Sequence, residues 1–439
     1  MKPNARAARH RNMRNTIRAG LGMLAAATTA ITAIGCASAP PPAQRPAAGP
    51  EVARGVAAVE PAASPRPLGA ADTAFGLSVL GAWCARYPEQ NLVFSPSTLA
   101  SALGMAYLGA RGTTAQAMAR VLHLPAGGGD ALAAQLQARS RALAGLDGPG
   151  VTLAASNQVW ADPALPPLSS YLDAVATGYG AGLAKVPFST NPQRAADEIN
   201  QAVSQATRGH IPRLVTPDMV NGIGWVLTSA LYMNAAWAAP FDPNQTAPGT
   251  FTPNGNARPV TVKYMNGPGF QYASAAGWTA ASLPYKGGKL TMTALLPPAG
   301  AGSCALPSQA GLRILTAPAG PGTAQVSLPK VNLSTDGAAG DMKPVLERLG
   351  MGLAFSDSAD FTGLSEQACC IGFVQQAATL QVGEKGTVAA AAVAVGVAAS
   401  AVLGSPRTIV FNRPYLMLVT DTSTGEPLFV AKVANPAAG

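Results

Sequence analysis

Apolar residues recur along most of this chain with the two periods typical of helices and strands. Helical spacing is present in segments 75–83, 96–108, 113–122, 195–205 and 344–350. Short apolar or alternating runs predict strands at 91–94, 151–160, 225–232, 250–252, 260–265, 281–285, 290–296, 326–333, 377–382 and 408–411. Gly and Pro turns separate the later strands, a spacing that indicates antiparallel sheet. An α+β fold is therefore expected.

Residues 384–406 have a pattern of their own. After Glu-Lys-Gly-Thr, the segment continues with alanine, valine and other small uncharged residues. In an extended conformation Thr387, Val393 and Val397 share one face and smaller residues occupy the other, which suits a strand that could be buried within a sheet. A buried helix and an Ala-rich linker are the alternatives, and the run is too short and weakly apolar for a membrane span. The strand patterns on both sides favour the strand.

Motifs near the C-terminus give the chain a family resemblance. Glu384-Lys385-Gly386-Thr387, followed by small residues, resembles the hinge of the reactive loop in serpins, the serine protease inhibitors. The family's C-terminal signature is resembled by segments 411–415, 421–425, 428–430 and 435–436. With upstream segments in matching order, the resemblance covers about residues 72–436.

The resemblance implies a serpin-like α+β fold and an inhibitor, not an enzyme. The expected architecture is a large mixed central β-sheet, further β-sheets, about eight or nine helices and an exposed reactive loop at about 384–406. A serine protease would attack the loop and form an acyl-enzyme. The cut loop would then insert as a strand and trap the protease, which is general serpin behaviour. A non-inhibitory serpin cleaved as a substrate, or an envelope hydrolase, are the alternative functions.

The composition of the predicted hinge fits insertion into a sheet. By resemblance its residues are Glu384, Gly386, Thr387, Ala389, Ala390, Ala391 and Ala392. A charge in the inserted part would lose its hydration at a cost of several kcal/mol, and a proline would interrupt the hydrogen-bond ladder. Residues 387–397 contain neither, which favours an inhibitor.

The bond that the protease would cut has two candidate positions. Counting from Glu384 by the usual hinge length of the family gives Ser400–Ala401, whereas counting back from the following strand gives Leu403–Gly404. The first count is preferred because insertion is anchored at the hinge. Small residues on both sides suit elastase-like or subtilisin-like proteases, while Leu403 would suit a chymotrypsin-like one.

Five residues correspond to the part of the serpin sheet that opens during insertion. Trp237 matches the family tryptophan at the top of the sheet, and Ser95 and Thr98 match the hydroxyl residues lower down. A family histidine and its asparagine partner fall at Gln376 and Ser229. Both members of one hydrogen-bonded pair have changed, and glutamine and serine could form a substitute bond.

The N-terminus is typical of an exported bacterial protein. Residues 1–35 read as a signal peptide, with a basic start and a short apolar segment. Cys36 follows a sequence similar to a lipobox, so we expect a lipid anchor there and a lipoprotein of the cell envelope or cell surface. Ordinary cleavage near 37–39 and secretion is the alternative. Residues 36–68, rich in Pro and Ala, predict a tether, and 69–439 a single domain.

The net charge gives no indication of nucleic-acid binding. The chain carries a formal +9, from 30 basic and 21 acidic residues, but six of the basic residues precede Cys36. The remaining chain, at +3, lacks the basic footprint of a nucleic-acid-binding protein. The expected partners are a serine protease and, through Cys36, a membrane; a monomer is expected.

Catalytic and cofactor motifs are not found in the sequence. Only His123 and His210 lie outside the leader, and no Gly-x-Ser-x-Gly elbow or phosphate-binding loop occurs. The cysteine spacing gives no zinc pattern, so neither metal nor cofactor is expected. The remaining cysteines are Cys84, Cys304, Cys369 and Cys370. Export permits disulfides, but pairing cannot be read from the sequence, and free thiols are the default expectation.

Overall fold

The computed structural model describes residues 49–125, 129–253, 258–317, 322–335, 340–387 and 407–438. Several predicted positions lie outside these ranges: Cys36, Ala389, Ala390, Ala391, Ala392, Ser400, Ala401, Leu403 and Gly404. The start of the hinge and the surrounding sheet are described.

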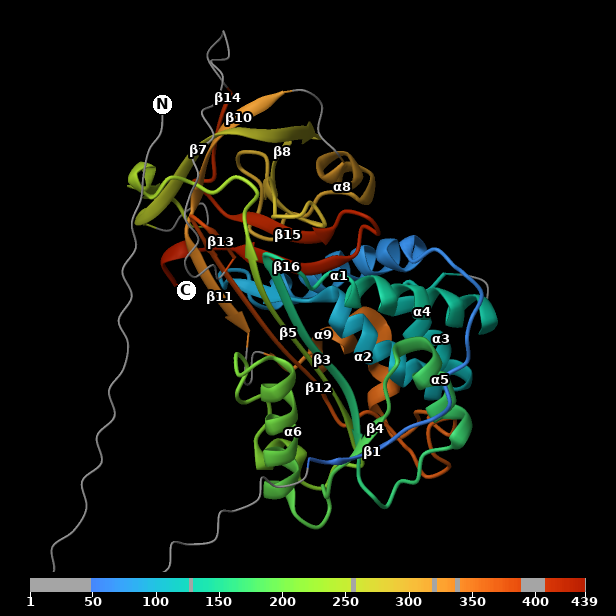
Figure 1. The fold of residues 1–439 in the computed structure, drawn as a ribbon. Coiled ribbons are helices and arrows are strands. Elements are labelled where there is room, and N and C mark those ends of the chain that lie inside the picture. The colour runs from blue at the N-terminus through green and yellow to red at the C-terminus, as the bar shows by residue number, and fades with distance from the viewer. Residues whose placement is uncertain are drawn as a thin grey trace, which may run out of the picture. The chain divides into compact units, whose positions relative to one another are not determined.

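Seven strands form the first sheet, which is mixed. Their order is β1 (Glu51–Ala53), β4 (Leu183–Lys185), β3 (Val151–Ala161), β5 (Trp225–Ala236), β13 (Gly386–Thr387), β12 (Val374–Gly383) and β11 (Val331–Thr335). The pairs β3–β5 and β11–β12 are antiparallel, whereas β5–β12 is parallel. Figure 1 shows β3, β5 and β12 running side by side along the molecule. The expected large mixed sheet is confirmed.

The second sheet has nine strands, most of them from the second half of the chain. Its path is β14 (Arg407–Val410), β10 (Thr323–Pro329), β7 (Val260–Ala275), β8 (Trp278–Pro284), β9 (Leu290–Leu296), β15 (Tyr415–Asp421), β16 (Pro427–Val433) and β2 (Leu92–Phe94), with β6 (Ala247–Phe251) beside β7. β14 runs parallel to β10, and the other neighbours are antiparallel. The antiparallel spacing read from the sequence is therefore confirmed.

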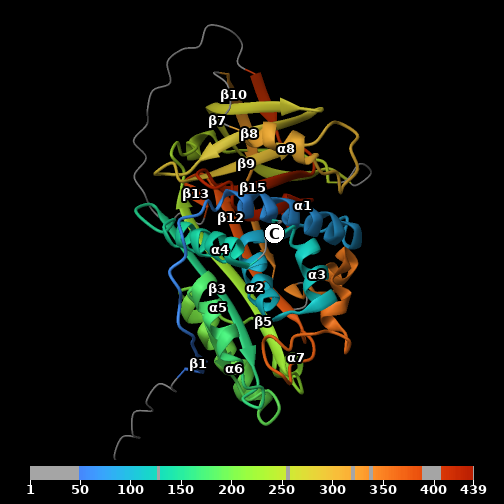
Figure 2. The ribbon, with the colours of Figure 1, turned by 90° about the vertical axis from the view of Figure 1, so that its right-hand side faces the viewer.

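Helices cover both faces of the first sheet, with most of them on one face and the helix at 192–206 on the other. The described part of the chain contains α1 (Arg66–Arg86), α2 (Pro96–Gly109), α3 (Gly112–Val121), α4 (Gly129–Ala144), α5 (Ser169–Tyr179), α6 (Pro192–Ala206), α7 (Pro217–Val220), α8 (Gln309–Thr316) and α9 (Lys343–Leu346). Ser95 caps α2 by accepting a hydrogen bond from the Thr98 N–H, and Pro96 occupies the first turn. α2 then packs against β3 and β5 (Figure 2).

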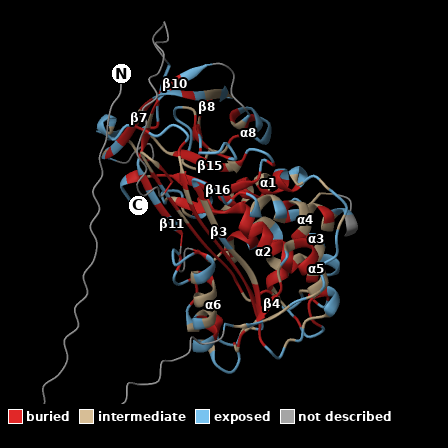
Figure 3. Ribbon diagram, viewed as in Figure 1, coloured by how far each residue is buried: buried red, intermediate tan, exposed pale blue. Residues whose placement is uncertain are grey.

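The core lies between the sheets and the inner helices. α2 is buried along almost its whole length, and buried residues continue through β5, β12 and β16 (Figure 3). α1 is long and apolar enough to cross a membrane by composition, but 67% of its most apolar window is buried inside the fold. It is therefore placed as a core helix of this domain.

The N-terminal part of the structure differs from the expected tether. β1 pairs with β4, and the chain beyond it is held by hydrogen bonds from the Val56 N–H to Asp173 and from the Ala58 N–H to Thr177. The tether expected for residues 36–68 is thus corrected for 51–68, which belong to the folded body, α1 itself starting at Arg66. These bonds use backbone groups, so a Pro- and Ala-rich composition carries no signal for them.

The default of four free thiols is also corrected. Cys84 in α1 and Cys304, in the loop before α8, form a disulfide with Cα atoms 5.6 Å apart. The pair is 220 positions apart in the sequence, and only the packing of the loop on α1 brings the two sulfurs together. Cys369 and Cys370 remain thiols.

Candidate functional site

The hinge residues enter the first sheet as a short strand. Gly386 and Thr387 form β13, which lies antiparallel to β5 on one side and to β12 on the other. Further along, β5 and β12 pair directly with each other, from Leu227↔Val374 to Tyr232↔Thr379. Thr387 therefore lies at the point where the two strands separate, and it aligns with Ala235 of β5 and Val382 of β12.

Thr387 is fixed there by an aromatic pair. Its Oγ1 lies 2.6 Å from the hydroxyl of Tyr285, and both residues are completely buried. Burial raises the pKa of Tyr285 despite the hydrogen bond with Thr387, so the phenol is neutral. The Tyr285 ring stacks on Trp237 with centroids 4.4 Å apart. The indole N–H of Trp237 donates to the Gly383 carbonyl at 2.9 Å, which joins the pair to the end of β12.

Gly386 is required by the space available between the strands. Its φ is 150°, a conformation that side chains with a Cβ rarely adopt. A Cβ at this position would lie 2.1 Å from the Ala235 carbonyl oxygen. The glycine of the hinge motif thus allows the chain to run directly against β5.

Glu384 anchors the turn that leads into β13. Its carboxylate forms an ion pair with Lys330 at 2.9 Å and accepts a hydrogen bond from the Thr246 hydroxyl at 3.0 Å. Partial burial raises its pKa, but hydrogen bonds from Lys330, the backbone and Thr246 outweigh this and lower the pKa below the ordinary value. The Glu384 carbonyl also accepts from the Phe241 N–H at 2.9 Å. The side chain and the backbone are both held.

The four residues predicted lower in the sheet form one buried hydrogen-bond network. The Gln376 Nε2 donates to the Ser95 carbonyl at 3.0 Å and to Ser229 Oγ at 3.2 Å. Ser229 Oγ in turn donates to Thr98 Oγ1 at 2.8 Å. All four residues are buried. The substitute bond considered for glutamine and serine is present and links β12 to β5, while Gln376 Oε1 has no partner among the described residues.

Neither histidine lies in a hydrolase-like arrangement within the described ranges. His123 Nε2 is 3.4 Å from Ser78 Oγ at an exposed position, but that hydroxyl also bonds the Ala74 carbonyl. No carboxylate of the described residues is bonded to His123, although the serine–histidine–acid arrangement needs one to orient the ring. His210 stacks on Tyr232 with centroids 3.5 Å apart. These contacts do not favour the hydrolase alternative.

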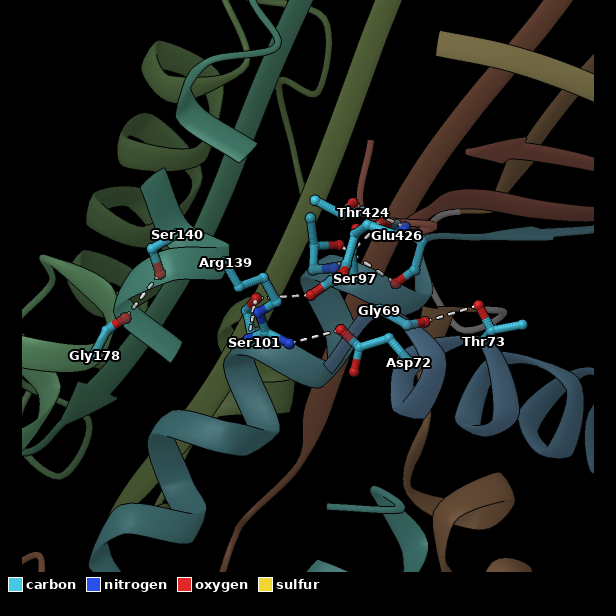
Figure 4. Close-up of polar contacts among 12 residues, drawn as sticks. Gly69, Asp72, Thr73, Ser97, Ser101, Arg139, Ser140, Gly178, Thr424 and Glu426 are labelled. Carbon is cyan, nitrogen blue, oxygen red and sulfur yellow. Dashed lines mark hydrogen bonds and ion pairs between the residues drawn. The ribbon is translucent and has the colours of Figure 1, made fainter. Parts of the chain in front are cut away.

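A second buried polar cluster was not predicted from the sequence. Arg139 of α4 reaches Asp72 of α1 at 2.6 Å and Ser101 of α2 at 3.1 Å (Figure 4). Glu426 lies in the same cluster, and neither carboxylate oxygen has a hydrogen-bond partner among the described residues. Burial, together with the negative charge of Asp72, raises the pKa of Glu426 well above the ordinary value. The protonated form of the glutamate is therefore favoured, and the cluster brings three helices together with the residue that precedes β16.

Tyr285, Lys330 and Thr246 are the hinge contacts that sequence reasoning missed. Each comes from a strand end or turn more than 50 positions from the hinge. None carries a local motif, so the sequence contains no signal for them.

Comparison with known proteins identifies the family of this chain. The sequence model of the family described as serpin, serine protease inhibitor, matches residues 70–436. A serpin-like protein of Thermococcus kodakarensis is 32% identical over 365 residues, 80% of this chain and 82% of that protein. The leukocyte elastase inhibitor of Sus scrofa is 29% identical, covering 84% and 99%. Serpin48 of the insect Tenebrio molitor, a solved structure, is 28% identical, with a TM-score of 0.72 over 84% and 98% of the two chains.

The family match spans nearly the whole described body, from α1 to the C-terminal turn, and the expected α+β serpin architecture is confirmed by the fold neighbours. The chain belongs to the serpin family, the serine protease inhibitors.

Proposed function

We propose that this protein inhibits serine proteases as a suicide substrate. The observation that carries the proposal is the position of Gly386 and Thr387, which lie antiparallel between two strands that are parallel to each other. A chain that continues in this direction forms an antiparallel partner for both β5 and β12. The residues that follow, 388–397, are small and uncharged, as such a central strand requires.

The chemistry of inhibition would come from the protease. Its serine attacks a carbonyl of the loop, the peptide bond breaks, and the new amine leaves with a proton from the protease histidine. The upstream part of the loop remains attached as an ester and enters the sheet from Thr387 onward. The serpin contributes the strand, and the free energy of closing the sheet distorts the protease before water hydrolyses the ester.

Ser400–Ala401 is the proposed reactive bond, with Leu403–Gly404 as the alternative. Small residues on both sides suit the shallow specificity pockets of elastase-like or subtilisin-like proteases. The similarity to a leukocyte elastase inhibitor supports the same class. A trypsin-like target is disfavoured because its pocket would leave a buried Asp unpaired.

The test is formation of an SDS-stable complex with elastase or subtilisin. We expect a complex with the unmodified chain, and Thr387→Arg should give a cleaved fragment only, since it would bury an unpaired charge between β5 and β12. Thr387→Ser, which keeps the hydroxyl, is the matched control and should still form the complex. Mass spectrometry should show that the released fragment begins at Ala401. A fragment without any complex from the unmodified chain would instead support a non-inhibitory serpin.

Location at a membrane is a separate proposal that rests on Cys36. Acylation of this residue would anchor the protein to the cell envelope through the segment that precedes β1. Cys36→Ala should release the protein from membranes, because it removes the residue that would carry the lipid. A diacylated anchor there would hold far more strongly than a single acyl chain. Unchanged membrane association of that variant would exclude the lipobox.

A further inference from the structure

The segment that precedes β12 brings together three side chains with metal-binding chemistry. Asp357 follows the short 3₁₀ turn Gly352–Phe355, while Cys369 and Cys370 lie just before the buried Ile371. The Ile371 N–H donates to the Ala354 carbonyl at 3.0 Å, which holds the two stretches side by side. One carboxylate oxygen and both sulfurs lie within 4.8 Å of one another.

We propose that Asp357, Cys369 and Cys370 bind a zinc-type divalent cation. Two thiolates and one carboxylate are a ligand set that suits Zn²⁺, with water completing a tetrahedral site. The role is independent of the reactive loop, and the family's inhibitory mechanism does not require it.

The geometry is within reach of such a site. The two sulfurs lie 2.9 Å apart, whereas metal–sulfur bonds of about 2.3 Å in a tetrahedron require roughly 3.8 Å between the sulfurs. Asp357 and Cys369 are exposed and Cys370 is half-buried, so rotation about χ1 can supply the difference of about 1 Å. No buried group has to move.

The two cysteines have a physical reason to remain thiols. Cα atoms of adjacent residues are about 3.8 Å apart, which is shorter than the roughly 4.4–6.8 Å usual for a disulfide. In the same structure the disulfide-bonded Cys84 and Cys304 have Cα atoms 5.6 Å apart. The chain thus contains a cross-link where the geometry suits one and a dithiol where it does not.

Cation binding at this dithiol is coupled to proton release, because thiolates and not thiols are the metal ligands. Binding would release the thiol protons to solvent and leave two thiolates and the carboxylate on the metal. Because up to two protons are displaced, apparent affinity should rise by up to about a hundredfold per pH unit.

The test uses the full chain with Cd²⁺ as a spectroscopic probe and Zn²⁺ as competitor. A thiol count of three (Cys36, Cys369 and Cys370), or of two where Cys36 is acylated, and an intact Cys84–Cys304 bond are verified first. We expect one Cd²⁺ per chain, an ultraviolet sulfur-to-cadmium charge-transfer band, displacement by Zn²⁺, and the predicted rise in affinity with pH. Cys369→Ser and Cys370→Ser should each abolish stoichiometric binding. Asp357→Asn should weaken binding by at least about tenfold.

Glu366→Gln is the matched control, because Glu366 is an exposed carboxylate of the same loop. It should bind like the unmodified chain. A melting temperature that rises with Zn²⁺ in the unmodified chain and not in the serine variants is the second measurement. The proposal is overturned by a band that survives in the double serine variant, by unchanged affinity in Asp357→Asn, or by a dithiol found oxidised in the exported protein. Protease trapping is not part of this readout, so either proposal can fail alone.

Discussion

The hydroxyl groups of Tyr285 and Thr387 lie 2.6 Å apart inside the protein. Thr387 is the last described residue of the hinge, and Tyr285 follows β8 of the second sheet. The bond therefore fixes the start of the loop to a part of the protein other than the two strands beside it. Removing this hydrogen bond should loosen the hinge without changing the space between β5 and β12 in which Thr387 lies.

Tyr285→Phe tests that relationship. The ring and its stacking on Trp237 are retained, but one buried hydrogen bond worth about 1 kcal/mol is lost. Amide hydrogen exchange at Gly386 and Thr387 should accelerate by about fivefold. Tyr264→Phe is the matched control, because the Tyr264 hydroxyl donates to the Thr250 carbonyl at 3.0 Å instead. Equal exchange at the hinge in Tyr285→Phe and the unmodified chain would show that the bond does not hold the hinge.

A double-mutant cycle tests the bond between Gln376 and Ser229. Gln376→Ala removes the donor to the Ser95 carbonyl as well as to Ser229, so it should lower the free energy of unfolding by about 1–3 kcal/mol. When Gln376→Ala is combined with Ser229→Ala, the loss of stability should differ from the sum of the two single losses by a coupling energy of about 0.5–1.5 kcal/mol. The measurement is urea denaturation of the four proteins. Strictly additive losses would mean that the pair is in contact without net interaction.

Loss of the Cys84–Cys304 disulfide should destabilise the fold. The bond closes a long loop, 220 positions, and its removal should cost about 2–5 kcal/mol. Thermal denaturation of Cys84→Ala/Cys304→Ala measures this. Cys369→Ala/Cys370→Ala replaces the same number of cysteines without removing a cross-link, and in metal-free buffer it should melt like the unmodified chain. A similar loss in both variants would contradict the structural role of the disulfide.

Glu426 makes stability depend on pH. The ordinary pKa of 4.5 applies in the unfolded chain, and the folded pKa is raised well above it by burial and by Asp72. Between these values the folded protein binds the extra proton, so this contribution to stability declines as the pH rises above about 4.5. Glu426→Gln should lack that decline. Urea denaturation at pH 4 and pH 7 should show that the variant's free energy of unfolding rises relative to that of the unmodified chain at the higher pH. An identical difference in the free energy of unfolding at both pH values would exclude the assignment.

The sequence by itself determined the fold class, five of the helices, most of the strands and the start of the hinge, whereas α4, α5, α8, β1 and β4 were not predicted. Helical and strand periods, Gly and Pro turns, and caps such as Ser95 act over a few residues, so a single pass along the chain can detect them. The hinge motif was also visible because each residue meets a local demand: Gly386 for a tight backbone approach, Thr387 for a buried strand position.

The tertiary structure decided the contacts that join distant segments. Tyr285 beside Thr387, Lys330 on Glu384, Cys84 with Cys304, and β1 on β4 each depend on how separate strands and helices are packed and aligned. The same holds for Arg139 and Glu426, because nothing in the sequence marks these two ionisable residues as buried. Burial and pairing are properties of packed segments, and the period of one segment carries no record of which other segment will cover it.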